Sequence, residues 1–407
     1  QLCRVHAAYW TLTECNWTLG SLLPSVFKRR KMEFNELILK VTSCCNLNCR
    51  YCYVFNQGDN SYMSEPPVMS PRLIHSILFR INEHCRKHNI DEFLIIFHGG
   101  EPLMASKSFY THFIKEADKI VKDTKLLYGL QTNATLLSQE WIDLFQKLDI
   151  SIGVSIDGPR DASINRVYRN SGRPAYDSII AGINLLKANN LPVNILSVIN
   201  TSSDPHEVYA HLQDIGVEFA DFLFPDVTYD HGGSPKTGEW LCQLFDLWYD
   251  DESDRKPIIR YLDSVVGLFL GVERGYEVLG RKTNRTISIK PNGNLELVDN
   301  LKVCGNGFTH TGMNIVENSF DDIANNAVMR KYYYSHSSKV LCKECLDCDI
   351  CDICGGGNLA HRYSKHNGFN NPSVYCKDIR MLCTHIQHRL SVDLPTVFNS
   401  KNIKVLS

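Results

Sequence analysis

The sequence lacks the marks of several protein classes. No apolar run reaches the roughly 18 residues that a membrane-spanning helix needs, and neither an internal repeat nor a low-complexity tract is present. Lys and Arg number 43 against 45 Asp and Glu, a formal charge of −2, so neither nucleic acid nor a membrane is expected as a partner. The 407 residues are 43% apolar and 22% charged, which predicts a soluble globular protein of two or three domains.

Residues 1–31 lack the order of a secretory signal, because their basic cluster at 28–31 follows the apolar part instead of preceding it. Met32 comes directly after this cluster, and a strand pattern begins soon after it. We therefore expect Met32 to be the natural start, residues 1–31 to be a non-native or disordered extension, and the protein to be cytoplasmic.

Cysteine is abundant and clustered. Three of the 16 cysteines lie between Cys45 and Cys52, and five more recur at every third position from Cys342 to Cys354. A secreted disulfide scaffold is short and scatters its cysteines, so this clustering in a 46.4 kDa chain indicates intracellular metal chemistry.

Residues 32–235 alternate strand and helix patterns. Strands are predicted at 37–41, 93–97, 126–130, 150–155, 193–199 and 219–224, and helices at 73–89, 109–121, 141–148, 179–188 and 208–215. Six strands with helices between them predict an α/β fold with a parallel sheet and right-handed crossovers, closed into a partial barrel.

Polar residues follow the first four predicted strands. They comprise Cys45, Cys49 and Cys52, then 98–101, 131–133 and 157–159. The carboxyl ends of barrel strands meet at one rim, where active residues gather. We therefore expect the active site at this rim.

The pattern changes after residue 235. Two helices at 239–249 and 258–270 predict a helical connector over 236–285. Residues 286–390 hold short strands, Gly-rich turns and cysteines, which indicates a small α+β domain that depends on metal for its stability. A tail without motifs, 391–407, completes the chain.

The first cysteine cluster has Cys-x3-Cys-x2-Cys spacing at Cys45, Cys49 and Cys52. Three thiolates on a short loop can bind three corners of a [4Fe–4S] cluster and leave the fourth iron open for reaction. A zinc loop lacking its fourth ligand, or free thiols, are the alternatives. Cys44 competes with Cys45, but only Cys45 keeps the spacing.

This loop, with Tyr51 before the third cysteine, resembles that of the radical S-adenosylmethionine (SAM) enzymes. The resemblance implies that the open iron binds the amino and carboxylate groups of SAM. One electron then cleaves the sulfonium, and the resulting 5′-deoxyadenosyl radical abstracts hydrogen from the substrate.

The resemblance also implies a set of SAM contacts. Gly99, Gly100 and Glu101 match the Gly-Gly-Glu-Pro segment beside the methionine amino group, and Arg166, with Arg169 as competitor, is expected to pair with the carboxylate. Asn133, Ser155 and Asp157 match ribose contacts, and Tyr51 is expected at adenine.

The second cluster resembles the SPASM extension of radical SAM enzymes that modify peptides. Its ligand set would be Cys345, Cys348, Cys354 and Cys376, which close an auxiliary [4Fe–4S] site; a structural zinc site is the alternative. Positions 298 and 358, where a second auxiliary cluster would need cysteines, hold Val298 and Asn358, so that cluster is expected to be absent. Three further cysteines stay unassigned, either as a non-standard site or as free thiols: Cys304, Cys342 and Cys351.

Three stretches resemble the branch that forms cyclophane rings in ribosomal peptides: YCYVFNQGDNSY, KVCGNGFTHTGMN and CGGGNLAHRYSKHNGFNNPSVYC. The implied reaction joins a Cβ of a precursor peptide to an aromatic ring, with an electron donor such as flavodoxin or ferredoxin. Asp299 is the predicted proton acceptor and His361 a weaker candidate.

Two enzymes of related chemistry compete with this interpretation: an anaerobic sulfatase-maturing, formylglycine-forming oxidase and a thioether-forming maturase. A protein without catalytic activity is a further hypothesis, either an iron–sulfur electron carrier or a zinc-stabilised, peptide-binding scaffold. The residues that match SAM contacts argue against a protein of that kind, because an electron carrier has no reason to cleave SAM.

Overall fold

A computed structural model describes residues 32–232, 236–272 and 276–395. The predicted extension 1–31 and residues 396–407 of the predicted tail lie outside this part of the chain. From Met32 onward the chain forms one unit by its internal contacts.

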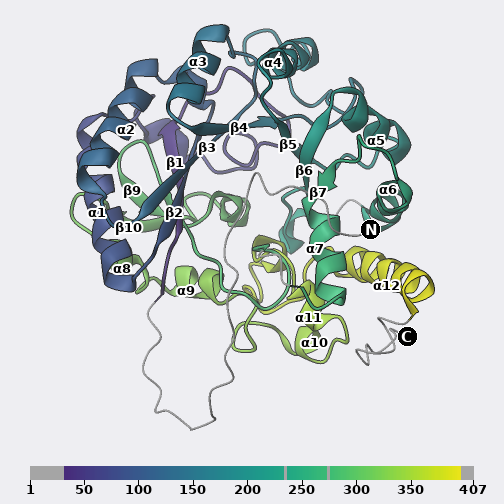
Figure 1. Ribbon diagram of the computed structural model, residues 1–407. Helices are drawn as coiled ribbons and strands as arrows, with labels where there is room; N and C mark the ends of the chain where they lie inside the picture. Colours follow the sequence, from purple (N-terminus) through teal and green to yellow (C-terminus); the bar gives the residue numbers. More distant parts are fainter. Residues whose placement is uncertain (1–31, 233–235, 273–275, 396–407) are drawn as a thin grey trace. The chain divides into compact units, whose positions relative to one another are not determined.

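A sheet of ten strands organises this unit (Figure 1). Its order is β10-β9-β8-β1-β2-β3-β4-β5-β6-β7. The six central strands pair in parallel and are β1 (Glu36–Thr42), β2 (Glu92–Gly99), β3 (Lys125–Thr132), β4 (Ile150–Ser155), β5 (Val193–Val198) and β6 (Val217–Leu223). All six predicted strands are present, and the predicted parallel α/β architecture is confirmed.

Helices cover the outer face of these strands (Figure 1). They are α1 (Arg72–His88), α2 (Lys107–Ile120), α3 (Gln139–Lys147), α4 (Tyr176–Ala188) and α5 (Pro205–Asp214). The alternation along β2 explains this arrangement, since Phe93, Ile95 and Phe97 are fully buried while Ile96 and His98 on the other face are half-buried. The half-buried face lines the inside of the partial barrel.

The C-terminal segment continues the same sheet. Strand β8 (Thr286–Ile289) pairs in parallel with β1, with Glu36 opposite Thr286, and β9 (Asn294–Glu296) and β10 (His310–Asn314) follow it antiparallel. At the other edge the short β7 (Ile258–Ile259) pairs with β6. The cysteine-rich segment is therefore joined to the barrel by main-chain hydrogen bonds.

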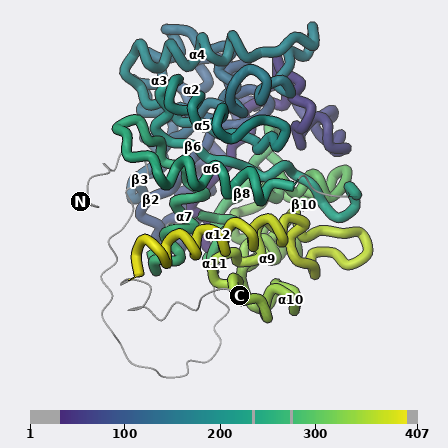
Figure 2. The backbone as a smooth tube through the Cα atoms, turned by 90° about the vertical axis from the view of Figure 1, so that its right-hand side faces the viewer, coloured from purple at the N-terminus to yellow at the C-terminus, as the bar shows by residue number. Residues whose placement is uncertain are grey.

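The remaining helices follow β6 along the chain. They are α6 (Gly238–Asp250), α7 (Arg260–Phe269), α8 (Phe320–Ile323), α9 (Ala327–Tyr333), α10 (Lys343–Leu346), α11 (Cys351–Cys354) and α12 (Cys376–Asp393). Figure 2 shows α12 alongside α6, and Asp378 joins the two helices by accepting from the Gly238 amide at 2.7 Å. The long last helix thus holds Cys376, at its first position, against the rest of the chain.

Candidate active site

The three cysteines of the first cluster lie on the loop after β1. Cys45, Cys49 and Cys52 are free and half-buried, and the Leu47 amide donates to the Cys45 sulfur at 3.4 Å. Burial is the main reason that the pKa of Cys45 is raised to about 12 and that of Cys49 to about 11, and neighbouring thiolates contribute to both rises. Three thiols are gathered where their anions are unfavourable alone, which is the environment that a cationic metal group satisfies.

The Gly-Gly pair brings the end of β2 against the cysteine loop. The Gly100 amide donates to Thr42 O at 2.9 Å, and the Glu101 amide donates to Cys44 O at 2.8 Å. A Cβ on Gly100 would lie 2.1 Å from Cys44 O, and one on Gly99, whose φ is +142°, would lie 2.3 Å from Thr42 O. The close approach that requires glycine here is to the cysteine loop itself.

Glu101 is buried beside this contact. Its carboxylate accepts from the Leu103 amide at 3.0 Å, the Thr132 hydroxyl at 2.6 Å and the Asn133 amide at 2.8 Å. Burial raises the pKa of Glu101 to about 7, although these three donors oppose the rise. The side chain is thus held in one orientation and is ready to ionise beside a cation.

Asn133 and Ser155 lie near the same rim. The Asn133 amide nitrogen donates to Asn46 Oδ1 at 2.9 Å and contacts the Cys45 sulfur at 3.8 Å. Ser155, the last residue of β4, accepts from Gln131 Nε2 at 2.9 Å. The structure therefore brings Asn133 against the cysteine loop, as the rim prediction requires.

Asp157 and Arg166 form a buried, bidentate ion pair. Arg166 Nε donates to Asp157 Oδ2 at 2.9 Å and Nη2 to Oδ1 at 2.7 Å. Tyr51 donates its hydroxyl to the same carboxylate, which also accepts from the Val198 amide at 3.0 Å. Both oxygens of Asp157 are thus engaged by the protein, and Tyr51 is joined to this pair. The competing Arg169 donates to Cys45 O at 3.0 Å.

Asp299 lies at the same end of the barrel, although it is distant in sequence. It begins the 3₁₀ turn η4 (Asp299–Cys304) and is paired with Lys40, both side chains being buried. Lys40 also donates to His98 Nδ1 at 3.2 Å. Burial alone raises the pKa of Asp299, but Lys40, Lys302 and His98 outweigh it and hold that pKa below its usual range.

Lys40 was not predicted as a site residue. The sequence contained an indication of its role, because Lys40 is a charged residue at an inward position of the largely apolar strand ELILKVT. Burial lowers the pKa of the adjacent His98 to about 3, and Lys40 lowers it further. The weaker candidate His361 is buried, with Nε2 at 3.7 Å from Asp226 Oδ1.

The second cysteine cluster brings six thiols together. Cys342 hydrogen-bonds Cys345, and burial raises the pKa of Cys354 to about 12, with Cys376 and Cys348 adding to the rise. Of the four predicted ligands, Cys345 and Cys348 pack with two of the unassigned cysteines, Cys342 and Cys351. The other two, Cys354 and Cys376, interact electrostatically with Cys348 and with each other. The third, Cys304, is buried elsewhere, with Asp226 and Asp230 as its charged neighbours.

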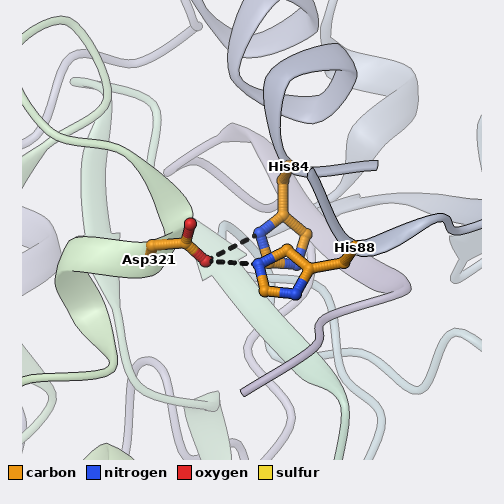
Figure 3. A group of neighbouring side chains, drawn as sticks. All are labelled: His84, His88 and Asp321. Atoms are coloured by element: carbon orange, nitrogen blue, oxygen red, sulfur yellow. Dashed lines mark hydrogen bonds and ion pairs between the residues drawn. The ribbon is translucent and has the colours of Figure 1, made fainter. Parts of the chain in front are cut away.

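His84, His88 and Asp321 form another group of potential metal ligands (Figure 3). It lies at the amino end of the strands, because α1 leads directly into β2. The Phe34 amide donates to His84 Nε2 at 2.9 Å, so the ring proton belongs on Nδ1, which faces Asp321 at 3.2 Å. Lys87 also pairs with Asp321. With no lone pair on Nδ1 for a cation, the group is a polar contact that joins α1 to α8.

These features define a class: an α/β barrel that gathers three free thiols and a Gly-Gly-Glu segment at the carboxyl ends of its strands. Comparison with known proteins agrees, since residues 39–215 match the radical SAM superfamily. The serine-type anaerobic sulfatase-maturating enzyme of Bacteroides thetaiotaomicron is 27% identical over 76% of this chain and 79% of that protein. The cysteine-type enzyme of Clostridium novyi is 27% identical over 58% of this chain and 65% of its own length, slightly less than two thirds.

Solved structures show the same fold. The enzyme anSMEcpe with bound AdoMet has a TM-score of 0.74 at 23% identity and covers 90% of this chain and 99% of its own. SuiB from Streptococcus suis, bound to its precursor peptide SuiA, has a TM-score of 0.52 at 16% identity over 81% of this chain and 72% of its own.

The chain therefore contains a radical SAM domain at residues 39–215, and proteins of that superfamily use a [4Fe–4S] cluster and SAM. The predicted radical SAM domain, the prediction of an enzyme, and the predicted [4Fe–4S] cluster and SAM are confirmed. The cyclophane branch and the auxiliary cluster stay predictions. Among the described residues, no helix combines the length and the apolarity needed to cross a bilayer.

Proposed function

We propose that Cys45, Cys49 and Cys52 hold the SAM-cleaving [4Fe–4S] cluster. The support is their gathering on one loop, free and half-buried, where thiolates need a compensating cation. When bound, the cluster and SAM supply a 5′-deoxyadenosyl radical that abstracts hydrogen. The protein's part is to hold SAM and substrate in line and to exclude water.

The surrounding polar groups are the proposed SAM contacts. Glu101, held by three donors, accepts a hydrogen bond from the SAM amino group. Asp157 accepts from Nε and Nη2 of Arg166, so Nη1 is the guanidinium nitrogen that has no acceptor in the described part of the chain. Nη1 is therefore the proposed donor to the SAM carboxylate. Asn133 and Ser155 bind the ribose hydroxyls. Asp157, whose oxygens are engaged, acts there mainly by positioning Arg166 and Tyr51.

The proposed substrate is a ribosomal precursor peptide, and the reaction removes two hydrogens from it. A hydrogen atom leaves a Cβ, the carbon radical bonds to a nearby aromatic ring, and the ring then loses one electron and one proton. The named peptide substrates of similar proteins support a peptide here: SuiB is bound to a precursor peptide, and anSMEcpe to the Kp18Cys peptide.

Asp299 is the proposed acceptor of that proton. Its low pKa, set by Lys40, keeps it ionised and makes it a weak base. A weak base suffices only for a strongly acidic proton, such as one on a ring carbon that must rearomatise. This buried pair at the barrel rim is the single observation that most favours a crosslinking oxidation.

Cys345, Cys348, Cys354 and Cys376 are the residues proposed to hold an auxiliary [4Fe–4S] cluster, which would supply the acceptor for that electron. Burial raises the pKa of three of these thiols, Cys345, Cys354 and Cys376, as it does at the first site. A flavodoxin or ferredoxin is the proposed donor of the electron that cleaves SAM. The second candidate function is formylglycine formation, which the similarity to sulfatase-maturating enzymes favours.

The test is incubation of the reduced, cluster-loaded enzyme with SAM and a candidate precursor peptide that contains an aromatic residue. Cyclophane formation predicts a product lighter by two hydrogens per crosslink, with a fragment-resistant ring and no reaction with a hydrazide. A hydrazide-reactive aldehyde at Ser or Cys would instead establish formylglycine formation. A product of unchanged mass would refute both.

The Asp299→Asn variant tests the proton acceptor. We expect 5′-deoxyadenosine still to form, while crosslinked product falls by at least about 100-fold. The matched control is Asp321→Asn, which removes another carboxylate paired with lysine, but at the amino end of the strands. If both variants lose product equally, Asp299 has no role in the proton transfer.

A further inference from the structure

Arg362 is a fully buried cation, and within the described residues all its hydrogen bonds go to main-chain oxygens. Its Nε donates to Gly356 O at 2.8 Å, Nη1 to Ser335 O at 2.7 Å, and Nη2 to Gly357 O at 2.7 Å and Gly355 O at 3.2 Å. Its exposed fraction is 0%. In the described ranges of the chain, no carboxylate lies within ion-pair distance of it.

His336 adds a second group of the same kind next to Arg362. Its Nδ1 lies 2.7 Å from Gly355 O, and its Nε2 lies 2.7 Å from Glu277 O. A neutral imidazole can donate only one of these bonds, whereas the protonated ring can donate both. Burial and Arg362 lower the pKa of His336, so its charged form also needs an anion nearby.

A buried cation without a counterion costs several kcal/mol, so its neighbours must supply negative charge. Three of the four carbonyls that accept from Arg362 belong to residues 355–357, which directly follow Cys354. A Cβ on Gly356 would lie 2.9 Å from the guanidinium carbon, so glycine is what lets the main chain wrap around it. Burial lowers the pKa of Arg362, and the acidic groups that most strongly oppose this effect are four nearby thiols: Cys354, Cys345, Cys342 and Cys351.

We propose that Arg362 is the built-in countercharge of the auxiliary cluster and raises its reduction potential. This inference rests on the proposed function, in which four thiolates hold a cluster that takes one electron from the substrate radical while the proton goes to Asp299. Reduction adds one negative charge to the site. A fixed cation in a water-free interior stabilises the reduced form more than the oxidised form.

The test is a redox titration of the cluster-loaded enzyme, followed by electron paramagnetic resonance, for wild type, Arg362→Gln and Arg362→Lys. Arg362→Gln is expected to lower the reduced fraction of the auxiliary cluster at least tenfold at a fixed potential. For a one-electron couple that is a midpoint about 59 mV more negative. Arg362→Lys, which keeps the charge, is expected to stay within threefold of wild type.

The matched control is Arg281→Gln. Arg281 is also near these cysteines, but it is partly exposed and paired with Asp352 at 2.8 Å, so its loss is expected to change the reduced fraction less than threefold. The SAM-bound cluster, titrated in the same samples, should keep its potential in every variant.

Each outcome separates the countercharge from the proposed function. Unchanged potentials in both Arg362 variants, or equal loss of auxiliary iron in both, would refute the countercharge and leave the proposed function intact. Loss of the cluster in Arg362→Gln but not in Arg362→Lys would support a requirement for charge. Zinc in place of auxiliary iron in the wild type would overturn the auxiliary cluster itself, while 5′-deoxyadenosine release would still report on the radical SAM site.

Discussion

The buried pair of Asp157 and Arg166 yields a quantitative prediction about what holds the barrel rim together. Its side chains are only 1% and 7% exposed. Through Tyr51 it holds the cysteine loop, and through the Val198 amide it holds the end of β5. Removing one partner of such a pair leaves an uncompensated buried charge, which costs about 3–5 kcal/mol.

The perturbation is Asp157→Asn, which keeps the shape of the side chain and removes its charge. For a unit of this length, an unfolding entropy of about 2.1 cal/mol/K per residue converts the cost into a fall in Tm of about 4–6 °C. The measurement is thermal unfolding of the cluster-free protein under reducing conditions at one scan rate, followed by circular dichroism.

A matched control is Asp177→Asn. Asp177 pairs with Arg160 near the same rim segment, but the two side chains are 75% and 58% exposed, so Tm should change by less than about 1 °C. The double variant Asp157→Leu/Arg166→Met should cost less than the sum of its single changes, because no unpaired charge remains. The reasoning is refuted if Asp157→Asn matches the control, or if the double variant is additive.

Three further predictions concern the two cysteine sites. Gly100→Ala places a Cβ 2.1 Å from Cys44 O, so it should displace the cysteine loop. The variant should then lose about four irons per chain and all formation of 5′-deoxyadenosine. Retained iron and activity would contradict this. SAM affinity, measured by equilibrium dialysis, should level off above about pH 8 and fall up to about tenfold per pH unit below pH 7. The reason is that the pKa of Glu101 is about 7, and its carboxylate accepts from the SAM amino group more strongly than its neutral acid. A flat profile from pH 5 to 8 would exclude Glu101. Cys348→Ala should lower the iron content by about four atoms per chain, whereas Cys304→Ala should not. The reason is that Cys348, unlike Cys304, packs with the thiols of the second cysteine cluster. Equal losses of iron would show that Cys304 is a ligand.

Local patterns predicted the barrel well. The strand predicted at 37–41 is observed as Glu36–Thr42, and the helix predicted at 73–89 as Arg72–His88. Such patterns succeed because burial against the outer helices imposes strict periodicity on each segment. The pairing of β8 with β1 had no such signal, because a strand's own residues do not identify its partner about 250 positions away.

The sequence could not show which of the predicted site residues would pair with each other in the folded protein. Arg166 and Asp157 were predicted as two separate SAM contacts, but the fold pairs them. The Gly-Gly pair was predicted to lie beside the amino group of SAM, and its close contact within the protein is with the cysteine loop. In each case two groups matched a pattern independently, and their distance from each other depended on loops whose course no local rule specifies.

Spacing along one short loop is enough to determine which metal chemistry three thiols can perform, because chain connectivity keeps Cys45, Cys49 and Cys52 together in any fold. The electrostatics belong to the tertiary structure. Lys40 meets Asp299, and Arg362 with His336 meets the second thiol group, only when distant segments pack together. Charge interactions depend on burial and on distances through space. Neither quantity can be obtained from the amino-acid sequence alone, because both depend on how distant segments pack.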